Sequence, residues 1–174
     1  PFTWALPQGV RIHVTGLGPN DPPLPPVRVP AHALMQAVFN LVQNAGQALG
    51  KRNQVNHEEG LSPGGNIWVS AELVKSDTPE ATKVKLVVRD DGPGMDAATV
   101  ARCTDAFFTT KPKDRGVGLG LFLVRSSVER YGGTLAIESV LGRGSTFTMM
   151  LPSDRPDLTI HTPSPSRTAD PRPG

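Results

Sequence analysis

The amino-acid sequence predicts an α+β fold, a two-layer sandwich with helices packed on one face of a mixed, mainly antiparallel sheet. Residues 31–50 carry apolar side chains at helical spacing. Several shorter segments alternate apolar and polar residues, or are rich in β-branched residues, as strands are. Their order along the chain is strand, helix, two strands, helix and hairpin. The 174 residues are enough for one domain with a sizeable core.

The first part of the chain is expected to hold one strand and the longest helix. Residues 10–14 (VRIHV) alternate apolar and polar side chains, which predicts a strand. The next stretch is too rich in Pro and Gly for regular structure, and extended chain resumes at residues 27–29 at the earliest. The helix over residues 31–50 should end at Gly50. Residues 51–65 are polar and contain glycine, so we expect a surface loop there.

The middle of the chain predicts two strands, a turn, a short helix and a loop. Residues 66–74 (NIWVSAELV) and 83–89 (KVKLVVR) are the two strands, joined by a turn. Residues 90–95 (DDGPGM) predict a tight turn, and residues 96–102 predict a short helix. Residues 103–118 show no apolar period, so we expect a mobile loop.

The last part of the chain predicts a helix, a hairpin and a tail. Residues 119–131 (LGLFLVRSSVERY) form an amphipathic helical pattern that two glycines end. Residues 134–140 and 145–151 then predict a hairpin across LGRG. We assign residues 1–152 to the folded domain. Residues 153–174 are rich in Pro and Ser, which is typical of a disordered tail or linker.

The composition excludes several classes of protein. A formal net charge of +2 is too small to indicate binding to nucleic acid or to an anionic membrane. Cys103 is the single cysteine, which excludes an internal disulfide and fits a reducing compartment. The opening PFTWALP lacks the basic and apolar regions of a signal peptide. No apolar run approaches the length needed to cross a bilayer. We therefore expect a cytoplasmic location.

A row of amides lies along one edge of the helix predicted over residues 31–50. Asn40, Asn44 and Gln47 occupy this edge, and residues four apart on a helix lie one above the other. Asn is a weak helix former, so two of them at this spacing suggest amides that converge on a ligand. The alternative is a pair of half-exposed amides. The apolar face beside them consists of Leu34, Val38, Leu41, Ala45 and Ala48, widened by Met35, Phe39 and Val42.

The turn at the end of the predicted strand 83–89 holds a carboxylate between glycines. Gly92 and Gly94 permit positive φ and let the backbone approach a flat ligand closely. The ionised Asp90 carboxylate can only accept hydrogen bonds, which suits the exocyclic amine of adenine and rejects the oxygen of guanine. The alternative is an ordinary turn from strand to helix, with Asp96 as the helix N-cap.

Two further glycine-bearing segments follow. Residues 116–121 (GVGLGL) end a loop and begin a helix, where bare N–H groups and the helix dipole favour an anion. Glycine hinges for a flexible loop explain them nearly as well. No Lys-Ser/Thr pair follows, so this is not a Walker loop, and the spacing is not that of a Rossmann motif. Residues 142–147 (GRGSTF) taken alone predict a hairpin turn.

The motifs NLVQNA, DDGPGM, FFTTKP, GVGLGL and GRGSTFTMMLP occur in this order with sensible gaps. Together they resemble the ATP-binding catalytic domain of two-component sensor histidine kinases, within the superfamily shared with gyrase, Hsp90 and MutL. FFTTKP and NLVQNAGQAL look most like the nitrogen-regulatory branch. The resemblance spans roughly residues 24–152. It implies the Bergerat-type fold of that superfamily, with ATP and Mg²⁺ as ligands.

The resemblance also implies roles for individual residues. Asn44 would ligate Mg²⁺, and Asn40 beside it would contact phosphate or metal. Asp90 would bind the adenine amine, and Lys111 would reach the terminal phosphates. Asn40, Asn44 and Lys111 are therefore the expected catalytic residues. The other expected nucleotide contacts are Gln47, Gly92, Gly94, Met95, Phe107, Thr110, Gly116, Val117, Gly118, Leu119, Gly120, Leu121 and Thr146.

The phosphoacceptor motif of these kinases, His-Glu with Pro five residues after the His, is missing. The nearest imitation is His57-Glu58, but Pro63 follows the His by six residues and the segment lies after the amide-row helix. We therefore expect His57 to be an ordinary loop histidine. The family also often has an Asp before that helix, where this chain has VRVPAH.

The expected function is phosphoryl transfer rather than hydrolysis. The superfamily's ATP hydrolases place a Glu one helical turn before the Mg²⁺ ligand, where this chain has Asn40, which cannot act as a base. A nucleophile from another domain would then attack ATP. The alternatives are a non-catalytic nucleotide-binding module, an ATPase of the same superfamily, or a serine-phosphorylating relative.

The expected partners follow from the same resemblance. They are the phosphoacceptor and dimerisation domain of the same protein, and a response regulator. The full-length protein would be a homodimer and the isolated domain a monomer. We expect no nucleic acid and no direct membrane contact, although the domain could be the cytoplasmic part of a membrane-bound sensor.

Overall fold

The structure is a computed structural model that describes residues 5–58, 63–75, 82–110 and 118–154, and these residues form the following helices and strands in chain order. They are β1 (Val10–Thr15), α1 (Ala31–Glu58), β2 (Gly65–Val74), β3 (Lys83–Asp90), α2 (Ala97–Arg102), α3 (Gly120–Arg130), β4 (Thr134–Val140) and β5 (Gly144–Pro152).

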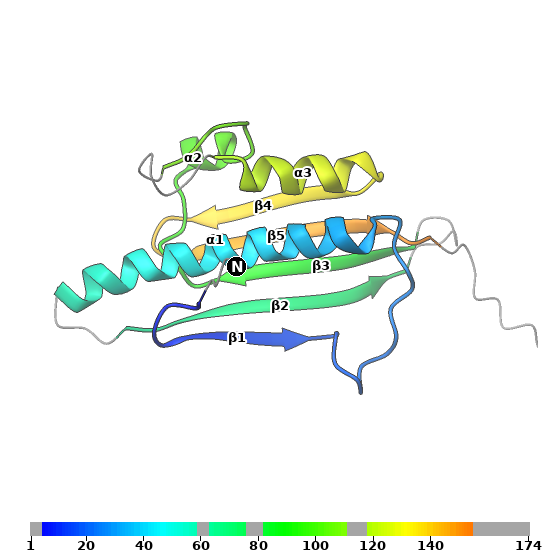
Figure 1. Ribbon diagram of the computed structural model, residues 1–174, viewed down its shortest axis with the longest axis horizontal. Coiled ribbons are helices and arrows are strands. Elements are labelled where there is room, and N and C mark those ends of the chain that lie inside the picture. The colour runs from blue at the N-terminus through cyan, green and yellow to red at the C-terminus, as the bar shows by residue number, and fades with distance from the viewer. Residues whose placement is uncertain (1–4, 59–62, 76–81, 111–117, 155–174) are drawn as a thin grey trace, which may run out of the picture.

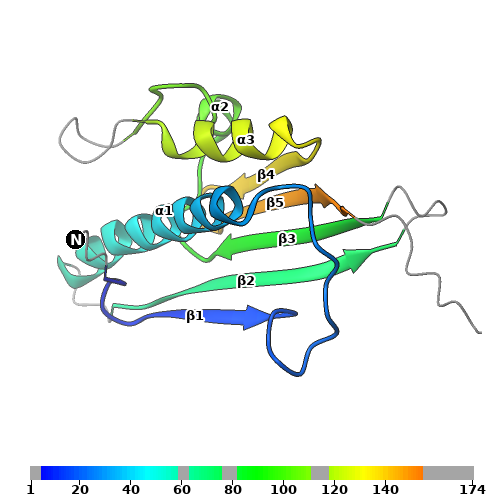
Figure 2. The same ribbon diagram turned by 45° about the vertical axis from the view of Figure 1, so that its right-hand side comes forward.

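The five strands form one mixed sheet in the order β1-β2-β3-β5-β4. β1 pairs with β2 in parallel, and the other three pairs are antiparallel. Helices α1 and α3 lie side by side on one face of the sheet (Figures 1 and 2). The predicted α+β two-layer sandwich with a mainly antiparallel sheet is confirmed.

The core lies between this face of the sheet and the two long helices. Alternation along β2, β3 and β5 turns every second side chain toward the helices, as the period of a strand requires. Helix α1 contributes a buried stripe at helical spacing, and α3 contributes two valines. The largest fully buried side chains are Leu41, Leu49, Ile67, Met149, Leu151, Val88, Val124 and Val128.

Helix α1 is longer than predicted. It runs on to Glu58, so the loop expected from residue 51 onward is wrong over its first eight residues. Gly50 lies inside the helix beside Pro7: a Cβ there would lie 3.3 Å from Cγ of Pro7, so the glycine lets the two segments approach closely. Asn53 anchors the added turns, since its Nδ2 donates to Gln8 O at 3.3 Å and its Oδ1 accepts from Gly64 N at 3.0 Å.

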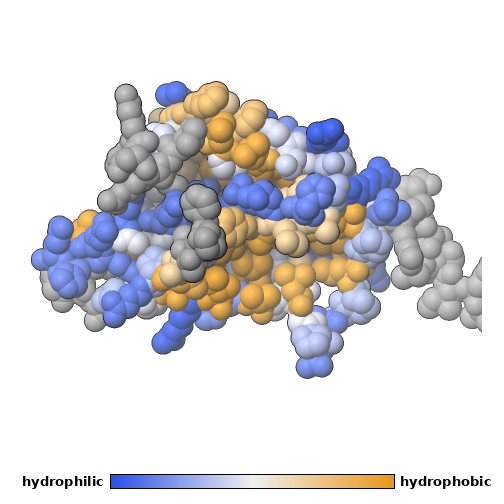
Figure 3. Space-filling view, in the orientation of Figure 1, coloured by the Kyte–Doolittle hydropathy of each residue, from blue (hydrophilic) through white to orange (hydrophobic). Residues whose placement is uncertain are grey.

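The buried stripe of α1 is also narrower than predicted on one side. Met35 is 71% exposed and Phe39 is 45% exposed, so neither widens the core. The physical reason is the sheet order, because β1 is an edge strand and no described helix covers it. Ile12 and Val14 of β1 are exposed for the same reason. Figure 3 shows apolar side chains gathered on the helical face beside α1.

The remaining predicted strands and helices are confirmed within one or two residues at their ends. Residues 27–29 form only a bridge, between Val27 and Ser153. The turn at residues 77–80, residues 111–117 of the loop expected over 103–118 and the tail from residue 155 lie outside the described residues. The mobility of that loop, the disorder of the tail and the boundary at residue 152 therefore stay predictions. Among the described residues, no helix is both long and apolar enough to span a membrane.

Candidate functional site

A cavity of roughly 390 Å³ opens between α1, the end of β3, α2 and the start of α3. This volume lies in the usual range for small-molecule sites. Ten of the residues that line it were predicted as nucleotide contacts. They are Asn44, Gln47, Asp90, Gly94, Met95, Thr110, Gly118, Leu119, Gly120 and Leu121.

The carboxylate at one end of this cavity belongs to Asp90, the last residue of β3. Asp90 is only 3% exposed, and its Oδ1 accepts the backbone N–H of Gly92 at 2.8 Å. Burial raises the pKa of Asp90 above its ordinary value, while hydrogen bonds from the N–H groups of Gly92 and Ser145 oppose that rise. The site therefore holds a desolvated acceptor in a fixed orientation.

The glycines of this turn serve close packing within the protein. Gly94 has φ of 66°, and a Cβ there would lie 2.0 Å from the carbonyl oxygen of Val140. A Cβ on Gly92 would lie 2.6 Å from Oδ1 of Asp90. Gly92 does not itself line the cavity, so its contribution is the N–H that it donates to the carboxylate.

The residue after Asp90, Asp91, joins the same turn to β2 and to α1. Its carboxylate accepts both the backbone N–H of Asn66, at 2.8 Å, and the Asn66 side-chain amide, at 2.9 Å. Arg52 of α1 donates to Asp91 O and also to Gly64 O, the latter at 2.7 Å. The sequence analysis missed this anchor. Its only signals were a second Asp beside Asp90 and an Arg in a segment expected to be a loop.

The amide row of α1 faces the start of α3. Asn44 and Gln47 line the cavity, and a Cβ on Gly120 would lie 3.7 Å from Nδ2 of Asn44. Asn40 does not line the cavity, because its Nδ2 points to Gly120 O at 3.5 Å and its Oδ1 accepts from Gln36 at 3.0 Å. Asn40 therefore joins α1 to α3 at the margin of the site.

The start of α3 and the base of the preceding loop close the other end of the cavity. Gly118 has φ of 74° and lies so close to the chain at Phe107 and Phe108 that a Cβ would come within 2.6 Å of both backbones. The backbone N–H of Phe107 donates to Gly118 O at 3.0 Å. The two ends of the loop are thus joined at its base. Lys111, Gly116 and Val117 lie outside the described residues.

At two positions the cavity is lined by the sequence neighbour of the predicted residue and not by that residue itself. Phe107 is 71% exposed and does not line the cavity, whereas Phe108 does. Thr146 lies on the face of β5 away from the helices, and Ser145 lines the cavity in its place. The reason in β5 is strand alternation, because Ser145 pairs with Asp90 and shares its face of the sheet.

The other lining residues were not predicted. Among them, Cys103 is 7% exposed and its Sγ donates to Val100 O at 3.2 Å. Burial raises the pKa of the Cys103 thiol, which disfavours the reactive thiolate. The complete set of unpredicted lining residues is Gln43, Ala45, Ala48, Lys51, Pro93, Thr99, Cys103, Phe108, Thr109, Ser145 and Phe147.

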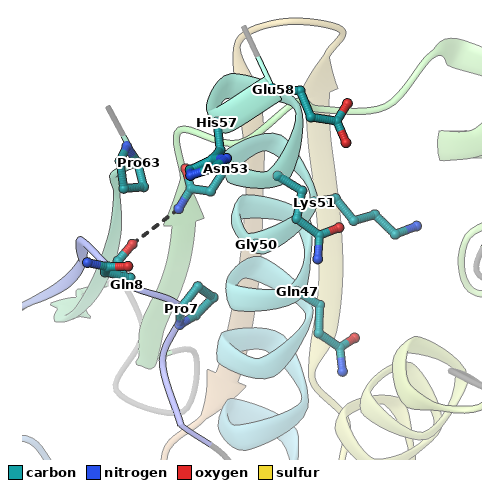
Figure 4. Close-up of a pocket in the computed structure, with 10 residues that line it drawn as sticks. Pro7, Gln8, Gln47, Gly50, Lys51, Asn53, His57, Glu58 and Pro63 are labelled. Atoms are coloured by element: carbon teal, nitrogen blue, oxygen red, sulfur yellow. Dashed lines mark hydrogen bonds between the residues drawn. The ribbon is translucent and has the colours of Figure 1, made fainter. Parts of the chain in front are cut away.

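A larger and more open hollow, of roughly 770 Å³, lies along the C-terminal half of α1 (Figure 4). It contains His57, which the structure places in the last turn of α1 and not in a loop. Figure 4 shows Asn53 bonded to Gln8 across one side of it. No buried carboxylate and no glycine turn at a helix start lines this hollow, so the smaller cavity is the candidate site.

Known proteins resemble this chain in sequence and in fold. A model of the family described as histidine kinase-, DNA gyrase B-, and HSP90-like ATPase matches residues 30–155. Sensor histidine kinase ZraS of Escherichia coli (strain K12) is 36% identical over 129 residues, which cover 74% of this chain and 23% of that protein. Sensory histidine kinase/phosphatase NtrB of Rhizobium leguminosarum is 31% identical over 153 residues, covering 87% of this chain and 38% of that protein.

Solved structures of histidine kinases are similar to the structure of this chain. The mycobacterial sensor histidine kinase MprB is 25% identical, with a TM-score of 0.55, and the match covers 86% of this chain and 83% of that chain. The catalytic domain of histidine kinase ThkA has a TM-score of 0.58 at 23% identity, over 83% of this chain and 79% of that one, which supports the fold. The chain spans only 23% and 38% of the length of ZraS and NtrB.

Proposed function

This chain belongs to the family of histidine kinase-, DNA gyrase B- and HSP90-like ATPases, and from that membership we propose that it is the catalytic domain of a sensor histidine kinase. The family is one of ATP-binding domains. The observation that carries the proposal is the buried Asp90 carboxylate, held by two backbone N–H groups at one end of a cavity whose other end is a glycine-rich helix start.

The Asp90 end of the cavity fits adenine. An ionised carboxylate accepts the exocyclic amine of adenine and repels the guanine oxygen. Because Asp90 is buried, that hydrogen bond forms in a poorly solvated site, where a mismatched partner costs more. Met95 and Phe147 add apolar walls on which a flat base can pack.

The α3 end fits phosphates. The backbone from Gly118 to Leu121 leads into the first turn of α3, where N–H groups lack helical partners and the dipole favours an anion. Lys111 remains a proposed phosphate contact outside the described residues.

The residues present also fit a Mg²⁺ ion bound together with the nucleotide. Asn44 brings an amide to the start of α3, and Mg²⁺ needs few protein ligands when phosphate oxygens and water complete its shell. The described residues contain no group of three or more His, Cys, Asp and Glu that could hold a metal alone, which is consistent with a shared site. When bound there, Mg²⁺ supplies positive charge to the phosphate oxygens.

The lining of the cavity favours transfer over hydrolysis. Among its described lining residues Asp90 is the only carboxylate, and it lies at the adenine end. Asn40, at the position where hydrolases hold a Glu, is an amide engaged with Gly120 and Gln36. With no carboxylate among the described residues that line the phosphate end, the domain can orient ATP for a nucleophile that arrives from outside. The proposed nucleophile is a His on the phosphoacceptor domain of the same protein, with a response regulator as the later acceptor.

The test is transfer of label from γ-labelled ATP to a separately produced phosphoacceptor domain of the full-length protein. We expect acid-labile label on that domain, a large loss with Asp90→Asn, and no loss with Thr146→Val, which removes a hydroxyl on the far face of β5. ATP binding without transfer would instead indicate a non-catalytic nucleotide-binding module. Rapid phosphate release would indicate an ATPase.

A further inference from the structure

Ser139 lies on β4 directly opposite Ser145 of β5, on the face of the sheet that carries the nucleotide site. Its hydroxyl makes three contacts within hydrogen-bond distance. The backbone N–H of Met95 donates to Ser139 Oγ at 2.8 Å. Ser139 Oγ donates to Gly144 O at 2.9 Å, and the hydroxyl of Ser145 lies 3.0 Å away.

These three contacts use the one donor and both acceptor positions of the Ser139 hydroxyl. Ser139 has a single proton, which goes to Gly144 O, so its two lone pairs receive Met95 N–H and the hydroxyl proton of Ser145. The Asp90 carboxylate also joins the turn to the hairpin, since it accepts the N–H groups of Gly92 and Ser145. The Ser139 hydroxyl is a second side-chain link between these two segments, and it is the one that bonds to Met95.

Each of these two segments contributes a residue that lines the adenine end of the cavity. Met95 and Ser145 line the cavity, and the N–H of Ser145 holds the Asp90 carboxylate. The turn and the hairpin also meet through their backbones, since Gly142 N donates to Pro93 O at 2.7 Å. Ser139 lies behind this junction and lines no part of the cavity itself.

We propose that Ser139 is a positioning residue for base recognition, which fixes the Asp90 carboxylate and Met95 at the spacing that selects adenine. The proposal rests on the proposed nucleotide site, and it adds a residue that acts on this site without lining the cavity. Without the hydroxyl, the N–H of Met95 and the hydroxyl of Ser145 lose their shared acceptor. The turn and the hairpin can then shift apart, and the selective hydrogen bond to the base is the interaction most sensitive to that shift.

The experiment compares Ser139→Thr with Ser139→Val, two side chains of nearly equal shape of which only the first keeps the hydroxyl. Dissociation constants are measured by calorimetry for ADP and for IDP, whose base carries an oxygen in place of the adenine amine. We expect the parent and Ser139→Thr to prefer ADP. For Ser139→Val we expect ADP affinity to fall about three- to tenfold, with IDP affinity little changed, so that the preference shrinks. Ser126→Ala, which removes an exposed hydroxyl from α3, is the matched control and should behave as the parent.

The outcomes separate this inference from the proposed function. A parent domain that binds neither nucleotide, or binds both equally, contradicts the adenine site itself. A parent that prefers ADP, with the same preference in Ser139→Val, overturns the role of Ser139. Equal loss of ADP and IDP affinity would also overturn it, because that pattern is the one expected of a purely structural residue. Amide exchange of the parent gives a check that needs no variant: an unprotected Met95 N–H would contradict the bond on which the role depends.

Discussion

Asp90 shows how function and stability oppose each other at a single residue. Its carboxylate is buried, and burial raises its pKa, so the folded domain without ligand holds a charge that would be more stable in water. The N–H groups of Gly92 and Ser145 offset only part of that cost. The unbound site therefore presents an acceptor to a hydrogen-bond donor, and the donor that we propose is the amine of adenine.

Replacing this carboxylate should separate binding from stability. We expect Asp90→Asn to weaken ATP binding by about 1.5–3 kcal/mol, the range for a lost hydrogen bond to a charged group, and to lower the preference for ATP over GTP. The same substitution should raise the thermal midpoint of the ligand-free domain, because it removes a buried charge. Calorimetry and thermal unfolding of both proteins measure the two effects. Equal affinity of the parent for ATP and GTP would contradict the role of Asp90.

The stability difference should depend on pH in a defined direction. A carboxyl whose pKa is raised on folding binds its proton more tightly in the folded state than in the unfolded state. Its destabilising effect is complete at pH above the folded pKa and disappears as pH falls below the unfolded pKa. We expect the advantage of Asp90→Asn over the parent to be largest near neutral pH and to vanish in acid. Urea unfolding of both proteins across that range provides the measurement, and an advantage that grows in acid would disprove this account.

Asn44 should contribute to ATP binding by acting as a ligand of Mg²⁺. The apolar face of α1 does not include its side chain, so Asn44→Ala should fold normally. Binding of ATP in the presence of Mg²⁺ should fall, while binding without Mg²⁺ should change little. Asn44→Asp should keep metal-dependent binding, and Gln54→Ala, an exposed amide on the same helix, should match the parent. Unchanged Mg-ATP affinity in Asn44→Ala would mean that this amide has only a structural role.

At the scale of elements, the extension of α1 past Gly50 depends on contacts that are distant in sequence. Asn53 is 8% exposed and bonds to Gln8 O and Gly64 N, which lie just before the neighbouring parallel strands β1 and β2. We expect Asn53→Ala to lower the free energy of unfolding by about 1–2 kcal/mol, because two backbone groups lose their partner. Gln54→Ala, the exposed neighbour, should change it by less than about 0.5 kcal/mol. Equal effects in urea unfolding would show that the amide contributes nothing specific.

The two long helices supply different chemical groups to the site. Helix α1 supplies the amides and α3 supplies the backbone N–H groups of its first turn, and Gly120 is the point at which they meet. The adenine end is built instead from strand ends, where β3 and β5 pair Asp90 with Ser145. The site is therefore formed where the ends of the inner strands β3 and β5 meet the helix layer, and no single element contains it.

At the scale of the whole molecule, this chain should bind Mg-ATP and yet neither label itself nor hydrolyse ATP appreciably. Binding follows from Asp90 and the start of α3, and the absence of hydrolysis follows from a phosphate end without a carboxylate among the described lining residues. His57 lies in the last turn of α1 and lines the other hollow, so we expect it to remain unphosphorylated. Incubation with γ-labelled ATP, with phosphate release followed in parallel, tests both parts. A stably labelled isolated chain would contradict the assignment of His57, and rapid release would contradict the kinase assignment.

The sequence by itself determined the fold class, the order of the elements and ten of the residues that line the candidate site. These features rest on local signals: period 2 or 3.6 in apolar residues, glycines at turns, and ordered motifs that place Asp90 at the end of a strand and Asn44 on a helix. Such signals act over a few residues, so they can be recognised without knowing what packs against them.

Only the tertiary structure decided features that depend on a distant neighbour. Gly50 lies inside a helix whose later turns are held by the bonds of Asn53 to Gln8 and Gly64, and Met35 is exposed because the sheet order leaves β1 at an uncovered edge. Ser145 rather than Thr146 faces the cavity because the register of β3 and β5 sets which face each residue joins. A helix end, the covered part of a face and the register of a strand pair are each fixed by contacts between segments far apart in sequence, which is why no local pattern could reveal them.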